Sequence, residues 1–222
     1  DSNNDDSIDI RDDTDANDSS TGDAVLYIVN IHTGQLIKKI STNVGSAEDP
    51  TGGNRPNGLA TVAPVDINDD FIADYIYAGD LFGNLWRFNV NSTDEADWAI
   101  FGKGSDPAVN PVFVAVDENN NPQPITARPD VAFTGTGALM VYFGTGQSLQ
   151  LADRVNTRQQ TFYGLLDNPE ADASARTTAI TTRGDMLRQI ADNPTDHTSG
   201  ETVRTYSANG SDKYTSWYVD LP

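Results

Sequence analysis

Short apolar runs recur along this chain between glycine-containing turns, and in two pairs of runs the second run places apolar residues at alternating positions. Two pairs of runs show the pattern most clearly, residues 25–30 with 35–40 and residues 74–79 with 85–90. The enclosed turns are His32-Thr33-Gly34 and Asp80–Asn84. Alternation with a period of two is typical of strands, and a short turn with glycine between two strands predicts a hairpin. Both hairpins consist of a strand, a glycine-containing turn and a second strand. This repetition favours a fold built from radial repeats.

Further runs extend the β pattern towards the end of the chain. They are residues 112–116, 129–133, 139–144, 161–166 and 216–219. Many short strands separated by Gly, Asn and Pro favour a sandwich, a barrel or a propeller. Asp117–Asn121 joins two runs and predicts a hairpin tip, in which Asp117, Asn119 and Asn121 place side-chain oxygens at alternate positions. A helix is expected only at Thr182–Ala191, where Thr182 caps the first turn and Asp185 completes a box-like start.

The nine residues from Asp66 to Asp74 carry the clearest candidate chemistry. Their oxygens stand at alternate positions, and the candidate ligands are the side chains of Asp66, Asn68, Asp70 and Asp74 and the carbonyl oxygen of Ile72. Calcium takes about six to eight oxygen ligands, which a tight loop supplies from alternate residues and one carbonyl. No basic residue lies within the loop to neutralise it. The spacing therefore predicts a Ca²⁺ site.

This loop departs from an EF-hand at two positions. Phe71 stands where an EF-hand has its turn-forming Gly, and Tyr77 stands where it has its bidentate Glu. Residues 75–79 after the loop predict a strand instead of a helix. We therefore expect a calcium clip between two strands, with Phe71 either strained or held by packing. The alternative is an Asp/Asn-rich turn that binds water and adopts left-handed backbone.

Composition narrows the classes of partner. The 222 residues carry a net charge of -19, with 37% hydrophobic content and a sequence pI of about 4.1. A large core is therefore possible, whereas nucleic acid and anionic membrane surfaces would be repelled. The chain has no Cys, which excludes disulfides, thiolate metal sites and a Cys nucleophile. No apolar run predicts membrane insertion, and a calcium site favours an exported protein.

The first 22 residues differ in composition from the rest. Residues 1–22 are nearly all Asp, Asn, Ser and Thr, which predicts an acidic solvated loop or linker. Asp13, Asp15 and Asn17 repeat the alternate-oxygen spacing and are candidates for a second cation site. In so acidic a segment the same spacing also arises by chance.

Three other features have plain structural explanations beside their functional ones. Arg183-Gly184-Asp185 is the integrin-binding tripeptide, yet a helix start explains the same residues. A group of aromatic residues in apolar runs favours core packing over carbohydrate or quinone stacking: Trp86, Phe88, Tyr142, Phe143, Phe162, Tyr163, Trp217 and Tyr218. His32 and His197 have no catalytic partner in the sequence, so a hydrolase triad is not favoured.

Residues Asp74–Phe88, DYIYAGDLFGNLWRF, strongly resemble the PilC/PilY family of tip-associated adhesins of bacterial type IV pili. Other stretches are similar to the same family in the same order, namely residues 124–129, 141–146, 162–164 and 217–222. The resemblance runs from about Gly22 to the end of the chain.

This resemblance implies an all-β fold in which residues 23–222 are part of one β-propeller domain, modified and quinoprotein-like. It places this domain in the C-terminal half of an exported protein at the cell surface, pilus tip or outer membrane. It implies a calcium loop Asp-x-Asn-x-Asp-x-x-x-Asp, matched by Asp66, Asn68, Asp70, Ile72 and Asp74. Calcium occupancy in that family is implicated in pilus extension and retraction. The implied partners are minor pilins at the pilus tip, cell or abiotic surfaces, and the remaining propeller blades.

The chain length bears on closure of the propeller. At four strands per blade it holds about three to four blades of a larger propeller, so we expect a fragment of a longer chain. Two alternative functions stay open: a calcium-dependent pyrroloquinoline quinone dehydrogenase and a purely structural extracellular filament module. The enzyme is disfavoured because all five candidate ligands lie in one local loop, whereas catalytic calcium keeps open positions towards a pocket.

Overall fold

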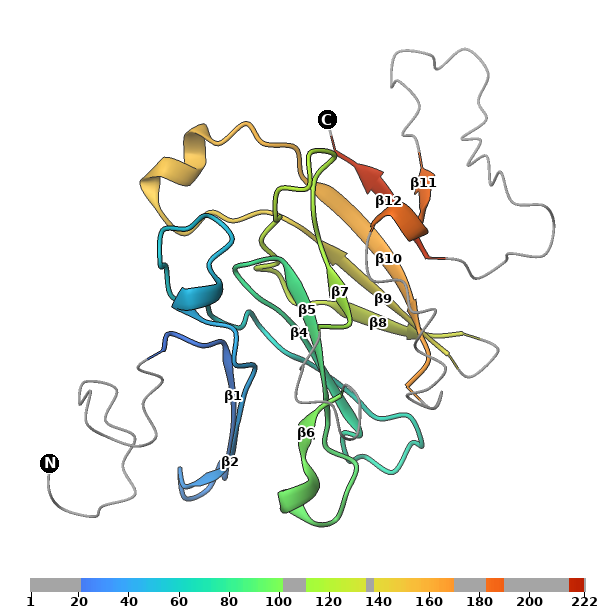
Figure 1. The fold of residues 1–222 in the computed structure, drawn as a ribbon. Coiled ribbons are helices and arrows are strands. Elements are labelled where there is room, and N and C mark those ends of the chain that lie inside the picture. Colours follow the sequence, from blue (N-terminus) through green and yellow to red (C-terminus); the bar gives the residue numbers. More distant parts are fainter. Residues whose placement is uncertain (1–20, 102–110, 135–137, 170–182, 190–215, 222) are drawn as a thin grey trace, which may run out of the picture.

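The computed structural model describes residues 21–101, 111–134, 138–169, 183–189 and 216–221. Within these ranges the chain forms strands, turns and short 3-10 helices, and contains no α-helix (Figure 1). The 3-10 helices are η1 (Ser46–Glu48), η2 (Glu95–Asp97), η3 (Leu151–Val155) and η5 (Arg183–Asp185). The strands of this part assemble into three sheets. The protein is therefore all-β, as the alternating pattern predicts.

The middle sheet is an antiparallel meander in chain order. It consists of β3 (Ala63–Val65), β4 (Tyr75–Gly79), β5 (Asn84–Asn89) and β6 (Ala99–Ile100), with β7 (Phe113–Val114) paired to β5. Side chains alternate between its two faces, and both faces are covered. Tyr75 and Tyr77 of β4 lie on one face, whereas Ala78 lies on the other. This sheet is the central layer of the described fold.

The larger sheet continues the same arrangement. Its order is β11 (Leu187–Gln189), β12 (Trp217–Asp220), β10 (Thr161–Asp167), β9 (Leu139–Gly144) and β8 (Asp130–Phe133). All neighbours are antiparallel except β11 and β12, which run parallel. The hairpin of β1 (Val25–Val29) and β2 (Leu36–Ser41) forms the remaining sheet.

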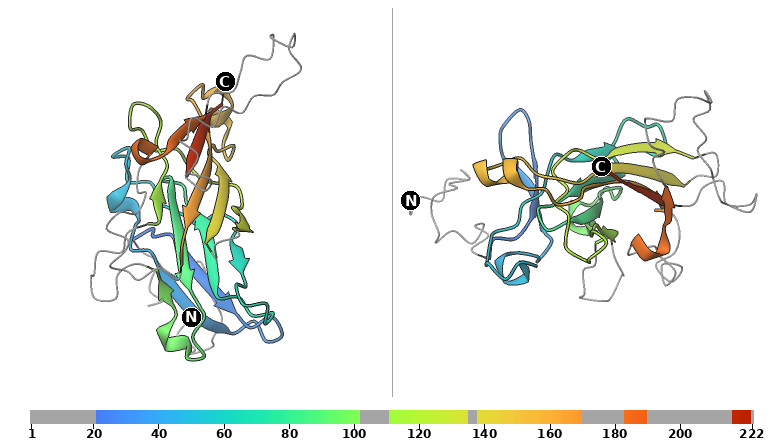
Figure 2. Two further views of the ribbon diagram at one scale, coloured as in Figure 1. Left: turned by 90° about the vertical axis from the view of Figure 1, so that its right-hand side faces the viewer. Right: turned by 90° about the horizontal axis from the view of Figure 1, so that it is seen from above.

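Two cores hold the three sheets together (Figures 1 and 2). The first lies between the middle and larger sheets, where the rings of Phe113 and Phe143 pack around Tyr163 with centroids 5.0 and 5.1 Å from its ring. The second lies between the middle sheet and the β1–β2 hairpin, around Trp86 and Phe88, both 0% exposed. Burying an aromatic or large aliphatic side chain contributes roughly 1.5–3 kcal/mol. Stacked meanders with shared cores are the packing of propeller blades.

Most of the predicted aromatic core is confirmed. Trp86, Phe88, Phe143, Tyr163 and Tyr218 are buried. The other three, Tyr142, Phe162 and Trp217, are half-buried on the opposite face of the larger sheet, where both other rings approach Trp217. The rings serve packing within and between the sheets.

The helix expected at Thr182–Ala191 is wrong for the residues that the structure describes. Arg183–Asp185 forms only the single turn η5, and Leu187–Gln189 forms β11 at the edge of the larger sheet. Pairing with β12 satisfies the backbone of β11, and this tertiary contact outweighs the local helix signal. The ends of the expected helix lie outside the described residues.

Candidate metal site

The loop Asp66–Asp74 connects β3 to β4, which are adjacent antiparallel strands, so the expected position between two strands is confirmed. Asp74 anchors the loop. Its N–H donates to Val65 O at 2.8 Å and its carbonyl accepts from Val90 N at 2.9 Å. The Asp74 residue is 7% exposed. The end of the loop is therefore fixed to the middle sheet, while its tip extends into solvent.

The carboxylate of Asp66 organises the first half of the loop. Its Oδ1 accepts from the N–H groups of Asn68 at 3.1 Å and Asp69 at 2.8 Å. Its Oδ2 accepts from Phe71 N at 2.7 Å. Three backbone donors therefore point at one carboxylate, which winds the chain around Asp66.

The other candidate ligands continue this winding. Asn68 Oδ1 accepts from Asp70 N at 2.9 Å, and Asp70 Oδ1 accepts from Ile72 N at 2.8 Å. Asp74 Oδ2 accepts from Ile67 N at 2.8 Å and closes the loop. These bonds fold the loop locally around its Asp and Asn side chains. Asn68, Asp70 and Ile72 are exposed, and Asp66 is half-buried.

Phe71 has strained backbone and is not held by packing. Its φ is +69° and its side chain is 98% exposed, while Asp69 has a φ of +62°. A bulky residue in left-handed backbone costs roughly 1–3 kcal/mol. The hydrogen bond from Phe71 N to Asp66 holds this conformation. Phe71 therefore adopts the turn that Gly supplies in an EF-hand.

Replacing Phe71 with Gly is expected to raise the free energy of unfolding by about 1 kcal/mol, because relief of strain exceeds the added flexibility of the unfolded chain. Ile72→Gly is the matched control, since Ile72 is not among the residues with positive φ, and it should destabilise. Urea unfolding of both variants measures the difference. Equal destabilisation by the two substitutions would show that the backbone at Phe71 is not strained.

The donor chemistry of the loop fits a hard cation. The candidate set contains only carboxylate, amide and carbonyl oxygens, which suit Ca²⁺ better than softer metals. Across the described ranges, no three or more acidic or histidine side chains already converge on one metal position. The oxygens of Asp66, Asn68, Asp70 and Asp74 accept backbone N–H groups instead. The second candidate cation site, Asp13, Asp15 and Asn17, lies outside the described residues.

The Arg183-Gly184-Asp185 tripeptide does not present a free arginine. Arg183 Nη2 donates to both carboxylate oxygens of Asp220, at 3.0 and 2.8 Å. Its Nη1 donates to Val116 O at 3.0 Å, and its guanidinium lies over the ring of Tyr218. These contacts fix η5 against β12 and give Arg183 a structural role.

The sequence did not predict a buried ion pair between the middle sheet and the larger sheet. Arg87 on β5 is 0% exposed, and its Nη1 donates to Asp167 Oδ2 on β10. The Tyr77 hydroxyl donates to the same oxygen at 2.7 Å. Arg87 is the only charged residue in the apolar run Leu85–Phe88, which signals a buried charge but not its partner. The cluster joins β4 and β5 to β10.

Stacked antiparallel meanders that share cores, with an aspartate-rich loop between two strands of one sheet, define a segment of a β-propeller. The family comparison agrees, since residues 12–204 match the family described as the PilY1 beta-propeller domain. The chain belongs to this family.

Known relatives support the assignment. The chain is 35% identical to type IV pilus biogenesis factor PilY1 of Pseudomonas aeruginosa strain PAK over 89% of its own length and 19% of the relative. It is 34% identical to a type IV pilus biogenesis factor PilY1 homolog of Xylella fastidiosa, over 91% of the chain and 14% of that protein. The chain therefore spans less than a fifth of these relatives.

A solved structure shares the fold. The crystal structure of the Pseudomonas aeruginosa PilY1 C-terminal domain superposes with a TM-score of 0.67 at 27% sequence identity, over 91% of this chain and 46% of that one. Among the residues described here, no helix is long and apolar enough to cross a membrane.

Proposed function

We propose that this chain is a calcium-binding, non-enzymatic propeller segment of a type IV pilus biogenesis factor. Asp66, Asn68, Asp70 and Asp74 would hold Ca²⁺ through side-chain oxygens, and Ile72 through its carbonyl. Occupancy of the loop would regulate pilus extension and retraction and surface attachment. The names of the relatives, type IV pilus biogenesis factors, support the pilus role and a non-catalytic one.

The observation that carries the calcium assignment is the winding of the loop around Asp66. Four oxygen-bearing side chains at alternate positions accept backbone N–H groups within the loop. Phe71 is held at a φ of +69°, in the position where a calcium loop turns sharply. A loop that only required solvation would need no bulky residue in this conformation.

Bound calcium would neutralise the negative charge of the loop. Asp66, Asp69, Asp70 and Asp74 place four carboxylates within nine residues, and their repulsion opposes the closed loop when no cation is bound. Drawing Asn68 and Asp70 towards Asp66 would order the connection from β3 to β4.

Strand β4 provides the route from the loop to the rest of the fold. Asp74 leads directly into Tyr75, whose ring lies 5.5 Å from the Arg87 guanidinium. Tyr77, two residues further, donates to Asp167 on the neighbouring sheet. An ordered loop would therefore stabilise the contact between the middle sheet and the larger sheet.

We infer that the protein is exported and acts at the cell surface, pilus tip or outer membrane. Its partners would be minor pilins, cell or abiotic surfaces and the remaining blades of its own propeller.

An alternative function, a pyrroloquinoline quinone dehydrogenase, would oxidise alcohols and reduce a dye when given the quinone and Ca²⁺. Absence of that activity in the calcium-loaded protein is the result expected here.

Calorimetric titration with Ca²⁺ tests the ligand assignment. The unmodified chain should bind one ion, and Asp66→Asn and Asp70→Asn should each weaken binding at least about tenfold, because each removes one negative ligand. Asp69→Asn is the matched control, since Asp69 is exposed in the same loop but outside the ligand set, and it should weaken binding less. Equal effects of all three substitutions would contradict the assignment.

Counting surface pili tests the regulatory part. Cells that make the complete pilus factor with Asp66→Asn should change their number of extended pili and their attachment, whereas Asp69→Asn cells should not. Unchanged pili in an Asp66→Asn strain that has lost calcium binding would favour a purely architectural ion.

A further inference from the structure

A polar cavity lies on a part of the fold separate from the calcium loop. The calcium loop precedes β4, whereas the cavity is formed by the hairpin tip after β7, which packs near the turn that follows β4. Ala115 N donates to Gly83 O at 2.8 Å, and Ile125 N donates to Asp80 O at 2.9 Å. The tip itself is closed by the bridge between Val116 and Pro122. The two regions therefore lie at opposite ends of β4.

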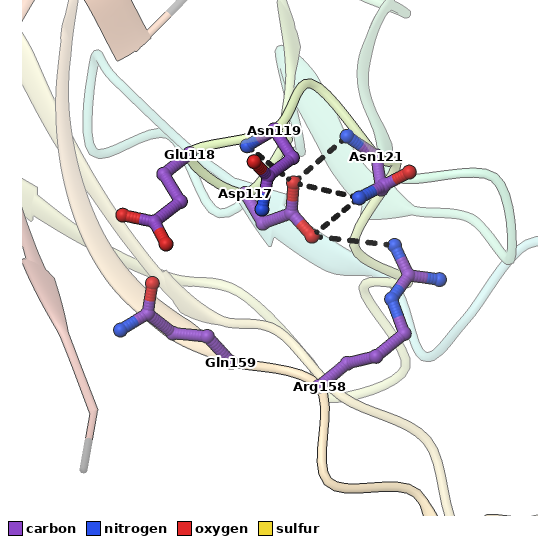
Figure 3. Close-up of a pocket in the computed structure, with 6 residues that line it drawn as sticks. All are labelled: Asp117, Glu118, Asn119, Asn121, Arg158 and Gln159. Carbon is purple, nitrogen blue, oxygen red and sulfur yellow. Dashed lines mark hydrogen bonds and ion pairs between the residues drawn. The ribbon is translucent and has the colours of Figure 1, made fainter.

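The cavity is an open depression of about 530 Å³, and all of its lining residues except Asp117 are exposed. Its walls come from two segments distant in sequence, the hairpin tip and the connection into β10. The lining residues are Asp117, Glu118, Asn119, Asn121, Arg158 and Gln159. Figure 3 shows Glu118 and Gln159 on one side and Arg158 beside Asn121 on the other, with Asp117 between them.

Asp117 organises the cavity and is 6% exposed. Its Oδ1 accepts from the N–H groups of Asn119 and Asn121, each at 2.9 Å. Its Oδ2 accepts from Asn121 Nδ2 at 2.9 Å and lies 3.5 Å from Arg158 Nη2. Burial alone would raise the pKa of Asp117, but the hydrogen bonds from Asn121 and Asn119 and the charge of Arg158 lower it. The carboxylate therefore stays ionised and fixes the tip.

Other polar groups of the cavity remain available. Among the described residues, the side chains of Glu118, Asn119 and Gln159 have no hydrogen-bond partner, and Figure 3 shows none between the residues drawn. Arg158 Nη2 donates to Pro122 O at 3.2 Å, and the Arg158 side chain is 45% exposed. The opening thus presents a carboxylate, two amides and a guanidinium, which supply both donors and acceptors.

This lining restricts the ligand. Among the residues that the structure describes, no aliphatic or aromatic residue lines the cavity, so an apolar ligand or a stacked quinone finds no matching surface. Arg158 pairs with Asp117, and Glu118 leaves the lining with one net negative charge, which disfavours an anion. The N–H groups of Arg158 and of the two amides are donors that a bare metal cation cannot use. A hydroxyl group both donates and accepts, and neighbouring hydroxyls match the paired polar atoms of carboxylate, amide and guanidinium.

We propose that this cavity binds one saccharide unit, with Glu118, Asn119 and Gln159 contacting its hydroxyls on one side and Arg158 on the other. Asp117 is a positioning residue that holds the tip in shape. This site acts independently of calcium binding at Asp66–Asp74, because the two regions share no residue.

The test titrates the chain with glucose, galactose, mannose and N-acetylglucosamine, followed by calorimetry and by amide NMR shifts. At least one sugar is expected to bind with a dissociation constant on the order of 1 mM, with shifts centred on residues 117–121 and 158–159. Glu118→Ala and Arg158→Ala should each weaken binding about tenfold, as expected for a lost hydrogen bond to a charged group. Excess chelator should leave the affinity unchanged.

Glu95→Ala and Arg154→Ala are matched controls, since both residues are exposed and outside the cavity, and they should leave binding intact. Thermal melts verify that each variant is folded, and Glu118→Ala provides the test if Arg158→Ala loosens the hairpin tip. Absence of sugar binding, shifts confined to other residues, or saturation by glycine without any sugar binding would overturn the proposal. Loss of sugar binding in chelator would overturn the claimed independence from calcium.

Discussion

Replacing Asp167 with Ala is expected to lower the free energy of unfolding by about 3–5 kcal/mol, the cost of breaking a buried ion pair from one side. Arg87 is 0% exposed, and its guanidinium carries a positive charge. Without Asp167 its guanidinium would remain in the core between two sheets with no counter-charge. The Tyr77 hydroxyl would lose its acceptor as well.

The surroundings of Arg87 explain why the loss is not compensated locally. Its Nε and Nη2 have no hydrogen-bond partner among the described residues. The ring centroid of Phe101 lies 3.5 Å from the guanidinium carbon, so one face of the cation already contacts an aromatic surface. Burial raises the pKa of Tyr77 and persists without Asp167, so the phenol stays protonated and cannot replace the carboxylate.

Urea unfolding followed by tryptophan fluorescence measures this prediction. Asp130→Ala is the control, because Asp130 is exposed on β8 and should change stability by less than about 0.5 kcal/mol. The double variant Arg87→Met/Asp167→Leu should recover most of the loss, since an apolar pair needs no counter-charge. A loss below about 1 kcal/mol in Asp167→Ala would contradict a structural role for the pair.

The strands were predictable because their signal is local. Residues 139–144 form an apolar run bounded by glycine-containing turns, and β9 covers the same six residues. The turn between β4 and β5 was equally visible, because Gly83 stands in a short turn between two strand-like runs. In the structure Gly83 takes a φ of +88°. β3 was missed because three residues are too short to show a period.

Long-range contacts set the limit of sequence reasoning. Arg87 and Asp167 are 80 residues apart, and no local pattern pairs them. The helix expected after Thr182 failed for a similar reason, because β12 supplies a partner for residues 187–189 from the end of the chain. The polar cavity likewise needs Arg158 and Gln159 opposite the tip at Asp117.

The spacing of the oxygen-bearing residues in the candidate calcium loop could be predicted from the sequence, but the backbone conformation of the loop could not. Alternate oxygens from Asp66 to Asp74 are visible in the sequence. The sequence left two possibilities for Phe71, strain or packing, and only its φ of +69° and 98% exposure decide between them. The hydrogen bonds to Asp66 show why the strain persists.

Adding Ca²⁺ at about one hundred times its dissociation constant is expected to stabilise the chain by about 2.7 kcal/mol, provided that the ion binds only the folded state. For a chain of this length that corresponds to a rise in melting temperature of roughly 5–11 °C. Excess chelator should reverse it. Differential scanning calorimetry of the chain with calcium and with chelator measures the shift.

Asp66→Ala should abolish this calcium-induced shift, whereas Asp69→Asn should retain most of it. Asp66→Ala also removes the acceptor of three backbone N–H groups, so its melting temperature without calcium should already be lower. The shift on adding calcium, and not the melting temperature itself, therefore reports the ion. An undiminished shift in Asp66→Ala would place calcium elsewhere in the chain.

Because Asp74 leads into β4, a loop that loses the ion should also weaken the contact of Tyr77 with Asp167. In an Asp167→Ala background, where this contact is already lost, calcium should therefore raise the melting temperature less.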